Sequence, residues 1–409
     1  MKTIAAQVMD RFTDADPGIR FDTSDENWTI ESGVLVASGA NDGILSEFAN
    51  SSLFNNGSIL SASEFEGSVT FDGDNGFIAN AAGARIIGGN DGILLDGHRE
   101  TVENHGSING LADDGVTFGV FSDHDVLTND GAIFGRSNGV GIFSADGGVI
   151  NNLGRIASDT VGVDIEIKSG QTTVITNATG ATISGPSEAI RVDNGGVFFD
   201  NHGTVTGEIA IDPSADAATI LNHGTISGLV FLGPGNDVFI GRGGTALPVF
   251  GGGGDDQLIG GSHADVLFGD NGNDRLNGAG GKDTLSGGSG FDTLTGGPGR
   301  DQFVFETNLD PAHNVDRITD FTANVDKIDL NDQVFLHLGG DGVLAAARFH
   351  VGAAPASAGD RIIYNPANGF LLYDPDGKGG AGEVHFATLA PHLGLHNTDF
   401  VVMHPFLEV

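Results

Sequence analysis

A nine-residue phrase, repeated without interruption in the second half of the chain, constrains the fold more than any other feature. Six consecutive copies run from Gly251 to Val304, and another copy occupies Leu232 to Ile240. Every copy carries an Asp, and a large apolar residue follows it two positions later. The Asp residues of the consecutive copies lie nine positions apart, at Asp256, Asp265, Asp274, Asp283, Asp292 and Asp301. This constant register argues against a flexible glycine-rich linker and predicts a stack of equivalent structural units.

Each part of the phrase has a physical role. The glycines permit left-handed or strained turns that direct backbone carbonyl oxygens inward. The Asp offers a hard carboxylate, and Ca²⁺ takes about six to eight oxygen ligands. The apolar residue, with an outward-facing neighbour on each side, indicates a short strand whose one inward side chain fills a thin core.

The phrase Gly-Gly-x-Gly-x-Asp-x-apolar-x resembles the calcium-binding repeat of RTX (haemolysin-type) proteins. The resemblance implies a parallel β-roll in which two nonapeptides complete one turn, so that loops eighteen residues apart share an ion. It implies about four to five Ca²⁺ ions. Four regular sites would join Asp256 to Asp274, Asp265 to Asp283, Asp274 to Asp292 and Asp283 to Asp301. A fifth would join Asp237 to Asp256, where the spacing is nineteen.

The resemblance also implies a ligand set. In the RTX family, carbonyl oxygens come from the second and fourth positions of one loop and from the first and third of the next, together with both Asp carboxylates. The first regular site would then use Gly252, Gly254, Gly269, Asn271, Asp256 and Asp274. The candidate metal ligands of the whole region are Gly233, Gly235, Asp237, Gly251, Gly252, Gly253, Gly254, Asp256, Gly261, His263, Asp265, Gly269, Asp270, Asn271, Gly272, Asp274, Gly278, Ala279, Gly280, Gly281, Asp283, Gly287, Ser289, Asp292, Gly296, Pro298 and Asp301.

Four places depart from the family pattern. His263 stands where its loop should have the fourth glycine, and Asp270 and Ala279 stand at second positions. The segment Gly241 to Phe250 lacks the Asp and is expected to form a loop without an ion.

A second, longer repeat precedes the nonapeptides. Its anchor is Asn-x-Gly-x-(Ile/Val), and successive anchors lie 21 to 25 residues apart. The anchors are Asn55, Asn80, Asn104, Asn129, Asn152, Asn177, Asn201 and Asn222, after a degenerate first copy at Glu31. Short apolar-alternating segments between Gly, Asn and Asp turns indicate two or three strands per repeat, as in a right-handed parallel β-helix with rungs of about 24 residues. Its anchor Asn side chains are expected to form a hydrogen-bonded ladder. The rungs are similar to passenger domains of bacterial surface and adhesin-like proteins.

Histidines mark the anchor turns. His105, His202 and His223 each follow an anchor Asn, and the last two are expected to stack on adjacent rungs. Such a pair suits a transition-metal ion, but the alternative of solvated turn residues is the commoner one.

One patch of the β-helix suggests catalysis. His98 and Arg99 lie on one rung beside Asp123 and His124 on the next, with Asp96, Glu100 and Asp125 nearby. Such a cluster could abstract the proton α to a uronate carboxyl. The alternative is a row of polar turn formers. The sequence contains no His-Glu-x-x-His, Gly-x-Ser-x-Gly or phosphate-loop motif, which favours a non-enzymatic role without excluding an enzyme.

The segments Asn314 to Asp332 and Arg361 to Leu389 resemble the C-terminal domain of serralysin-type proteases. The resemblance implies a small β domain that caps the roll and directs type I export, and Asp399 to Val402 match the Asp and hydrophobic residues with which that domain closes. The last seven residues, Met403 to Val409, depart from that pattern. Asp374 and Asp376 are more simply explained as hairpin-turn residues than as calcium ligands.

Composition limits the choice of partners. The chain has 409 residues, a formal net charge of −37 and no Cys. The acidity argues against nucleic acid and anionic membranes as partners, and the absence of Cys rules out a disulfide framework. Neither an apolar membrane span nor a cleavable signal peptide is expected.

The sequence therefore predicts a secreted all-β protein. Residues 1–30 would form an N-terminal cap segment, 31–230 the parallel β-helix, 231–304 the calcium-binding β-roll, and 305–409 a C-terminal β cap and secretion domain. The expected function is calcium-dependent folding outside the cell, in an adhesin-like or structural surface protein. Its candidate partners are calcium, a polysaccharide or cell-surface ligand, and a type I exporter. The alternative is an extracellular polysaccharide-modifying enzyme of lyase or C5-epimerase type.

Overall fold

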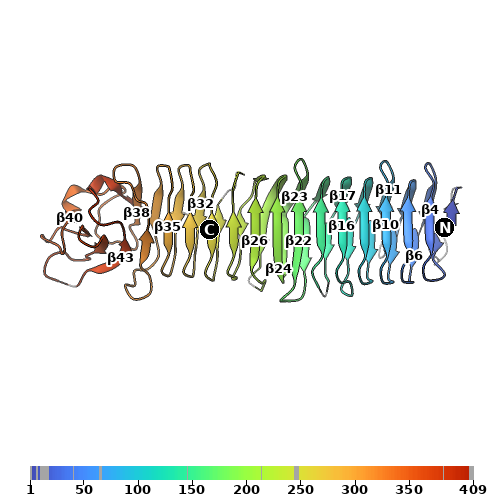
Figure 1. The fold of residues 1–409 in the computed structure, drawn as a ribbon, viewed down its shortest axis with the longest axis horizontal. Coiled ribbons are helices and arrows are strands. Elements are labelled where there is room, and N and C mark those ends of the chain that lie inside the picture. Colours follow the sequence, from blue (N-terminus) through green and yellow to red (C-terminus); the bar gives the residue numbers. More distant parts are fainter. Residues whose placement is uncertain are drawn as a thin grey trace. The chain divides into compact units, whose positions relative to one another are not determined.

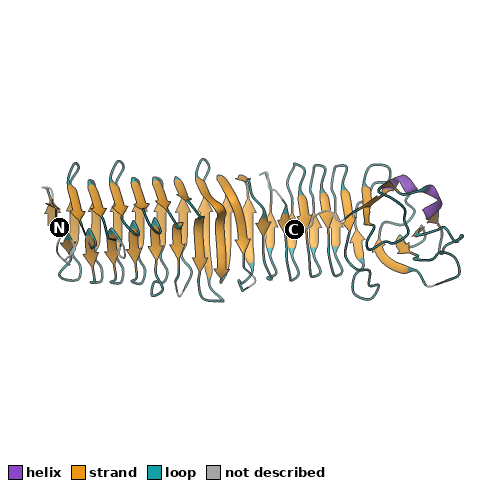
Figure 2. Cartoon of the chain, turned by 180° about the vertical axis from the view of Figure 1, so that it is seen from behind, coloured by secondary structure: helices purple, strands orange, loops and turns teal. Residues whose placement is uncertain are grey.

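The computed structural model describes residues 2–5, 8–9, 18–39, 41–63, 67–144, 146–212, 214–243, 248–380 and 382–404. The chain divides into two compact units, Met1–Leu229 and Val230–Val409. Figures 1 and 2 show strands in both units. The helical elements of the described ranges are two 3₁₀ turns, η1 (Ala346–Arg348) and η2 (Asn397–Asp399). No helix within those ranges is suited to crossing a membrane.

The first unit is a parallel β-helix whose rungs carry three rows of strands. The first row consists of β1 (Lys2–Ile4), β4 (Asn27–Ile30), β7 (Ser52–Asn55), β10 (Phe77–Asn80), β13 (Thr101–Asn104), β16 (Val126–Asn129), β19 (Val149–Asn152), β22 (Thr172–Asn177), β24 (Gly196–Asn201) and β26 (Ala218–Asn222). The second consists of β2 (Val8–Met9), β5 (Leu35–Ser38), β8 (Ser58–Ser61), β11 (Arg85–Gly88), β14 (Ser107–Gly110), β17 (Ala132–Gly135), β20 (Arg155–Ser158), β23 (Thr182–Asn194), β25 (Thr204–Ile211) and β27 (Thr225–Ile226). The third consists of β3 (Ile19–Arg20), β6 (Ile44–Ser46), β9 (Val69–Phe71), β12 (Ile93–Leu95), β15 (Val116–Phe118), β18 (Asn138–Ile142) and β21 (Val161–Glu166), and the long β23 pairs with both β20 and β21.

The anchor Asn residues form the predicted ladder. Each ends a strand of the first row, is fully buried, and pairs in register with the Asn of the next rung. The Nδ2 group of one Asn donates to Oδ1 of the next, at 2.7 to 2.9 Å along the whole row from Asn55 to Asn222. Ile30 occupies the equivalent place in the degenerate first repeat. The ladder satisfies buried amides that would otherwise be costly, and it fixes the register of the rungs.

The described parts of residues 1–30 belong to the same stack. β1 pairs with β4, β2 with β5 and β3 with β6, all in parallel. Residues 1, 6–7 and 10–17 of the expected cap segment lie outside the described residues.

The second unit begins as a parallel β-roll. Its two rows of strands are β29 (Val238–Ile240), β31 (Gln257–Ile259), β33 (Arg275–Asn277), β35 (Thr293–Thr295) and β37 (Asp316–Ile318) in one, and β28 (Val230–Phe231), β30 (Val249–Phe250), β32 (Val266–Phe268), β34 (Thr284–Ser286), β36 (Gln302–Phe305) and β38 (Lys327–Asn331) in the other. Within the nonapeptides, Leu258 faces Leu276 and Leu267 faces Leu285, which confirms that two of them complete one turn. The apolar residue of each phrase is buried as expected.

A small β domain follows the roll. β41 (Ile362–Asn365), β42 (Phe370–Tyr373) and β43 (Val384–Thr388) form two antiparallel hairpins. β40 (Phe349–Val351) pairs with β41, β39 (Gly342–Val343) pairs with β44 (Phe400–Met403), and β43 and β44 pair in parallel with the roll strands β37 and β38. Of the atypical C-terminus, residues 405–409 lie outside the described residues.

Candidate calcium-binding sites

The Asp residues of the nonapeptides form two columns, one at each edge of the roll. The backbone N–H of each Asp donates to Oδ1 of the Asp one turn later, as Asp256 does to Asp274 at 2.8 Å. The same bond joins Asp274 to Asp292 at 2.8 Å, and on the other edge Asp265 to Asp283 at 2.9 Å. All six Asp residues of the consecutive copies are at most 4% exposed. One carboxylate oxygen of each later Asp is therefore used to hold the stack together.

The second carboxylate oxygen is available to a ligand. Oδ2 of Asp256, Asp274, Asp283, Asp292 and Asp301 is buried and accepts no hydrogen bond. These oxygens occupy the space above the first glycine of their own loops: a Cβ added to Gly251 would lie 2.3 Å from Asp256 Oδ2 and 2.7 Å from the Gly269 carbonyl oxygen. A carboxylate from one loop and a carbonyl from the next thus converge on a position that only glycine leaves free.

Fourth-position carbonyls point along the stack. A Cβ on Gly272 would lie 1.7 Å from the Gly254 carbonyl oxygen, and one on Gly290 would lie 1.7 Å from that of Gly272. Both Gly272 and Gly290 also have positive φ angles, 145° and 140°, which residues with a Cβ rarely adopt. These two constraints account for the fourth glycine of the phrase.

The departures from the glycine pattern have different structural outcomes. Asp270 and Ala279 adopt the left-handed conformation of the glycines they replace, with φ of 68° and 69°. Neither Gly261 nor His263 is among the described residues with positive φ. Instead, Gly261 N–H donates to Asp265 Oδ2 at 2.6 Å, so this carboxylate oxygen is engaged within its own loop. The loop from Gly260 to Asp265 therefore departs from the other described nonapeptide loops at its second position, where all of them have a positive φ.

Burial and mutual repulsion perturb these carboxyl groups. Burial, reinforced by the neighbouring charges of Asp292 and Asp256, raises the pKa of Asp274 to about 8. Burial raises the pKa of Asp256 to about 7 and that of Asp283 to about 6, with further contributions from the adjacent Asp of each column. Columns of closely spaced anions in a desolvated site are unfavourable unless a positive charge lies between them.

Two further Asp residues extend the columns beyond the last nonapeptide. Asp292 N–H donates to Asp316 Oδ1 at 3.2 Å, and Asp301 N–H donates to Asp326 Oδ1 at 3.1 Å. Both added residues are buried; Asp316 is the first residue of β37, and Asp326 directly precedes β38. The sequence did contain a signal, since Ile318 and Ile328 follow these Asp residues by two positions as in the repeats. The longer loops, however, change the spacing to 24 and 25 residues and so hide the register.

The candidate catalytic residues of the first unit are partly brought together. His98 Nδ1 lies 3.2 Å from Asp123 Oδ2, and His124 Nδ1 lies 3.5 Å from Asp123 Oδ1. Within the described residues, Arg99 makes no ion pair, and it shares with His124 a left-handed turn conformation (φ 60° and 56°). Two of the other three carboxylates of the patch, Glu100 and Asp125, are 0% and 2% exposed and lie inside the rung, whereas Asp96 is half-buried. Glu100 and Asp125 therefore do not face outward with His98, Asp123 and His124, because each follows a left-handed turn residue and turns inward.

The Asp residues of the C-terminal hairpin behave as turn residues. Asp374 Oδ1 accepts the backbone N–H groups of Asp376 and Gly377, at 3.1 and 2.8 Å.

Comparison with known proteins agrees with the repeat assignment. Residues 250–285 and 277–306 match the family described as the RTX calcium-binding nonapeptide repeat. The chain thus contains RTX calcium-binding repeats. Among solved structures, it is similar to the AlgE6R3 subunit of the Azotobacter vinelandii mannuronan C5-epimerase, with 24% identity over 36% of this chain and 78% of that one, and a TM-score of 0.26. The comparison with curated proteins gives no match.

Proposed function

We propose that the two edges of the roll bind Ca²⁺ between successive loops, and that the protein acts outside the cell with these ions in place. The observation that carries the proposal is the set of buried Asp Oδ2 atoms without a hydrogen bond. Buried carboxylate oxygens are normally paired, so a column of unpaired ones fits a ligand that supplies positive charge. The donor set, which consists of carboxylate and carbonyl oxygens, suits Ca²⁺ rather than a transition metal.

The proposed sites follow the two columns. One edge would hold ions between Asp256 and Asp274 and between Asp274 and Asp292, and the other between Asp265 and Asp283 and between Asp283 and Asp301. The carbonyls of Gly252, Gly254, Gly269 and Asn271 would complete the first of these. The fifth site would lie between Asp237 and Asp256, which are joined by a 2.8 Å hydrogen bond. Asp316 and Asp326 add a carboxylate at the far end of each column, so they are candidate ligands for the last ions.

Calcium binding would be coupled to folding of the roll. Bound Ca²⁺ supplies the positive charge that lets the carboxylates approach each other, and without it their repulsion favours an open chain. Extracellular calcium modules bind at about 10⁻⁴ to 10⁻³ M, so the roll would fold after export and not before. This behaviour supports a secreted, adhesin-like or structural protein whose C-terminal domain passes through a type I exporter.

The proposal is tested by counting bound ions. Asp274→Asn should remove two Ca²⁺ per molecule, because Asp274 contributes to two sites, whereas Asp255→Asn should remove none. Asp255 is a matched control because it lies in the same column of loops but is exposed. Equilibrium dialysis against ⁴⁵Ca²⁺ gives the count, and equal ion counts for the two variants would refute the assignment.

A second function is favoured by the contacts among His98, Asp123 and His124. Paired imidazole and carboxylate groups can act as general base and acid on a uronate polymer. Incubation with alginate and pectin, followed by detection of unsaturated products or changed epimer ratios, tests this polysaccharide-modifying activity. If Asp123→Ala and His124→Ala leave an observed activity intact, the cluster is not its site.

A further inference from the structure

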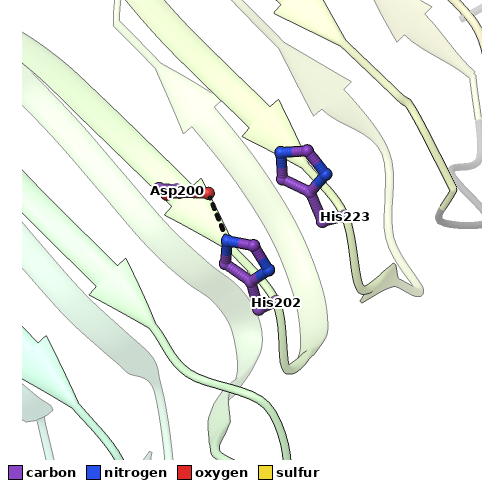
Figure 3. Close-up of side chains that lie close together, drawn as sticks. All are labelled: Asp200, His202 and His223. Carbon is purple, nitrogen blue, oxygen red and sulfur yellow. Dashed lines mark ion pairs between the residues drawn. The ribbon is translucent and has the colours of Figure 1, made fainter.

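The anchor turns of two successive rungs place two imidazoles against each other. β24 and β26 run parallel with Asn201 opposite Asn222, so His202 and His223 occupy the same position on neighbouring rungs. Their rings are stacked, with centroids 4.6 Å apart and planes within 8° of parallel (Figure 3). The predicted stacking is thereby confirmed. Both His residues are exposed, so a solute can reach the pair.

A carboxylate completes the group. Asp200 precedes His202 by two residues, and strand alternation puts the two side chains on the same outward face. Asp200 Oδ1 lies 3.1 Å from His202 Nε2 (Figure 3). Asp200 Oδ1 is buried and accepts no hydrogen bond, because its contact with His202 does not have hydrogen-bond geometry. This oxygen can therefore accept a metal ion. One ring nitrogen of each His and one oxygen of Asp200 all lie within 4.8 Å of one another.

We propose that Asp200, His202 and His223 form a site for a divalent transition-metal ion, for which Zn²⁺ is the probe of choice. Two imidazoles and one carboxylate suit Zn²⁺, Ni²⁺ or Cu²⁺, whereas Ca²⁺ and Mg²⁺ take oxygen ligands. Three protein ligands leave a further coordination position open to water or to a group on another molecule. This site is chemically distinct from the all-oxygen sites of the roll.

The geometry requires only side-chain adjustment. Ligand atoms on a tetrahedral Zn²⁺ are about 3.3 Å apart, because the bonds to nitrogen and oxygen are about 2.0 to 2.2 Å long. Rotation of the exposed His side chains can bring the ligand atoms, which lie within 4.8 Å of one another, to this separation. The backbone beneath them is held in place, since Asn201 Nδ2 donates to Asn222 Oδ1 at 2.8 Å within the buried ladder. A preorganised backbone with adjustable rings is a favourable arrangement for a metal site.

The β-helix contains its own control. Glu103 and His105 flank Asn104 as Asp200 and His202 flank Asn201, but the next rung offers Asp130 in place of a second His. His105 Nδ1 lies 2.7 Å from Asp130 Oδ1. This arrangement has similar exposure but offers one imidazole and two carboxylates, so it should bind transition metals weakly.

The test is calorimetric titration of Zn²⁺ into untagged protein at saturating Ca²⁺, which keeps the carboxylates of the roll occupied. The wild type should bind one equivalent of Zn²⁺. His202→Ala and His223→Ala should each abolish this binding, whereas His105→Ala should leave it unchanged. Asp200→Asn, which preserves the shape of the side chain but removes its charge, should raise the dissociation constant for Zn²⁺, because a neutral amide is a poorer ligand than a carboxylate. Bound Co²⁺ should show an absorption spectrum of nitrogen ligation that is lost with either His.

Circular dichroism of each variant checks that the β-helix is intact. The proposal is wrong if the Zn²⁺ equivalent persists in the double variant His202→Ala/His223→Ala, or if His105→Ala removes it as effectively. It is also wrong if the wild type binds no Zn²⁺ under these conditions.

Discussion

Replacing one anchor Asn should destabilise the β-helix far more than replacing its neighbour. Asn152 is fully buried and takes part in four hydrogen bonds. Its Nδ2 donates to Asn177 Oδ1 at 2.8 Å and to the Thr182 carbonyl oxygen at 2.9 Å. Its Oδ1 accepts from Asn129 Nδ2 at 2.9 Å and from Gly154 N–H at 3.3 Å. Asn152→Ala removes all four.

The magnitude follows from those contacts. A typical intramolecular hydrogen bond contributes about 0.5 to 1.5 kcal/mol net, and a buried group that loses its partner costs about 1 to 3 kcal/mol. Asn129 Nδ2 keeps a second acceptor, the Arg155 carbonyl oxygen, so part of the loss is compensated. We expect Asn152→Ala to lower the free energy of unfolding by about 3 to 5 kcal/mol.

Asn151 provides the matched control, because it lies on the same strand, β19, but faces outward and is half-buried. Asn151→Ala should change the free energy of unfolding by no more than about 0.5 kcal/mol. Urea unfolding at saturating Ca²⁺, followed by circular dichroism, measures both variants. If the two lose equal stability, the buried ladder does not stabilise the rungs and the reasoning fails.

Three further outcomes are expected. Burial raises the pKa of Glu100 from 4.5 to about 8. Between these two values the folded chain keeps a proton that the unfolded chain releases. The free energy of unfolding should therefore fall by up to about 1.4 kcal/mol per pH unit between about pH 5 and 8. Urea unfolding across this range should show that slope reduced in Glu100→Gln, and an unchanged slope would exclude Glu100 as its source. Gly272→Ala should weaken calcium-dependent folding of the roll, because the added Cβ would lie 1.7 Å from the Gly254 carbonyl oxygen. Gly253→Ala should be tolerated, because its Cβ would lie 3.8 Å from the nearest atom. Identical calcium titration curves for the two variants would contradict this prediction. Leu276→Ala, at a 1% exposed core position, should cost about 2 to 5 kcal/mol in the calcium-loaded protein, and a loss below about 1 kcal/mol in urea unfolding would show that the core of the roll is not packed around it.

The repeats made most of the fold predictable. A constant period fixes which residues face each other, so the pairing of Leu258 with Leu276 and the stack of His202 on His223 both follow from spacing. The Asn ladder could be predicted for the same reason, because identical amides at one position of every rung can satisfy each other.

The sequence does not reveal the positions at which the repeat spacing or the direction of a side chain changes. Asp316 and Asp326 continue the Asp columns at a different spacing, which a fixed nine-residue register does not reveal. Glu100 turns inward because the preceding residue, Arg99, has a left-handed backbone conformation. The backbone conformation of a single turn residue cannot be predicted from the repeat pattern. The altered loop from Gly260 to Asp265 likewise depends on one hydrogen bond, from Gly261 to Asp265.

We propose that Ca²⁺ bound between successive loops of each Asp column is required for the roll to fold. Far-ultraviolet circular dichroism of the whole chain, first in a chelator and then with added Ca²⁺, tests it most directly. We predict that Ca²⁺ increases the β signal, that Mg²⁺ at the same concentration does not, and that the double variant Asp274→Asn/Asp283→Asn loses most of the response. Identical spectra of the wild type with chelator and with Ca²⁺ would contradict the account.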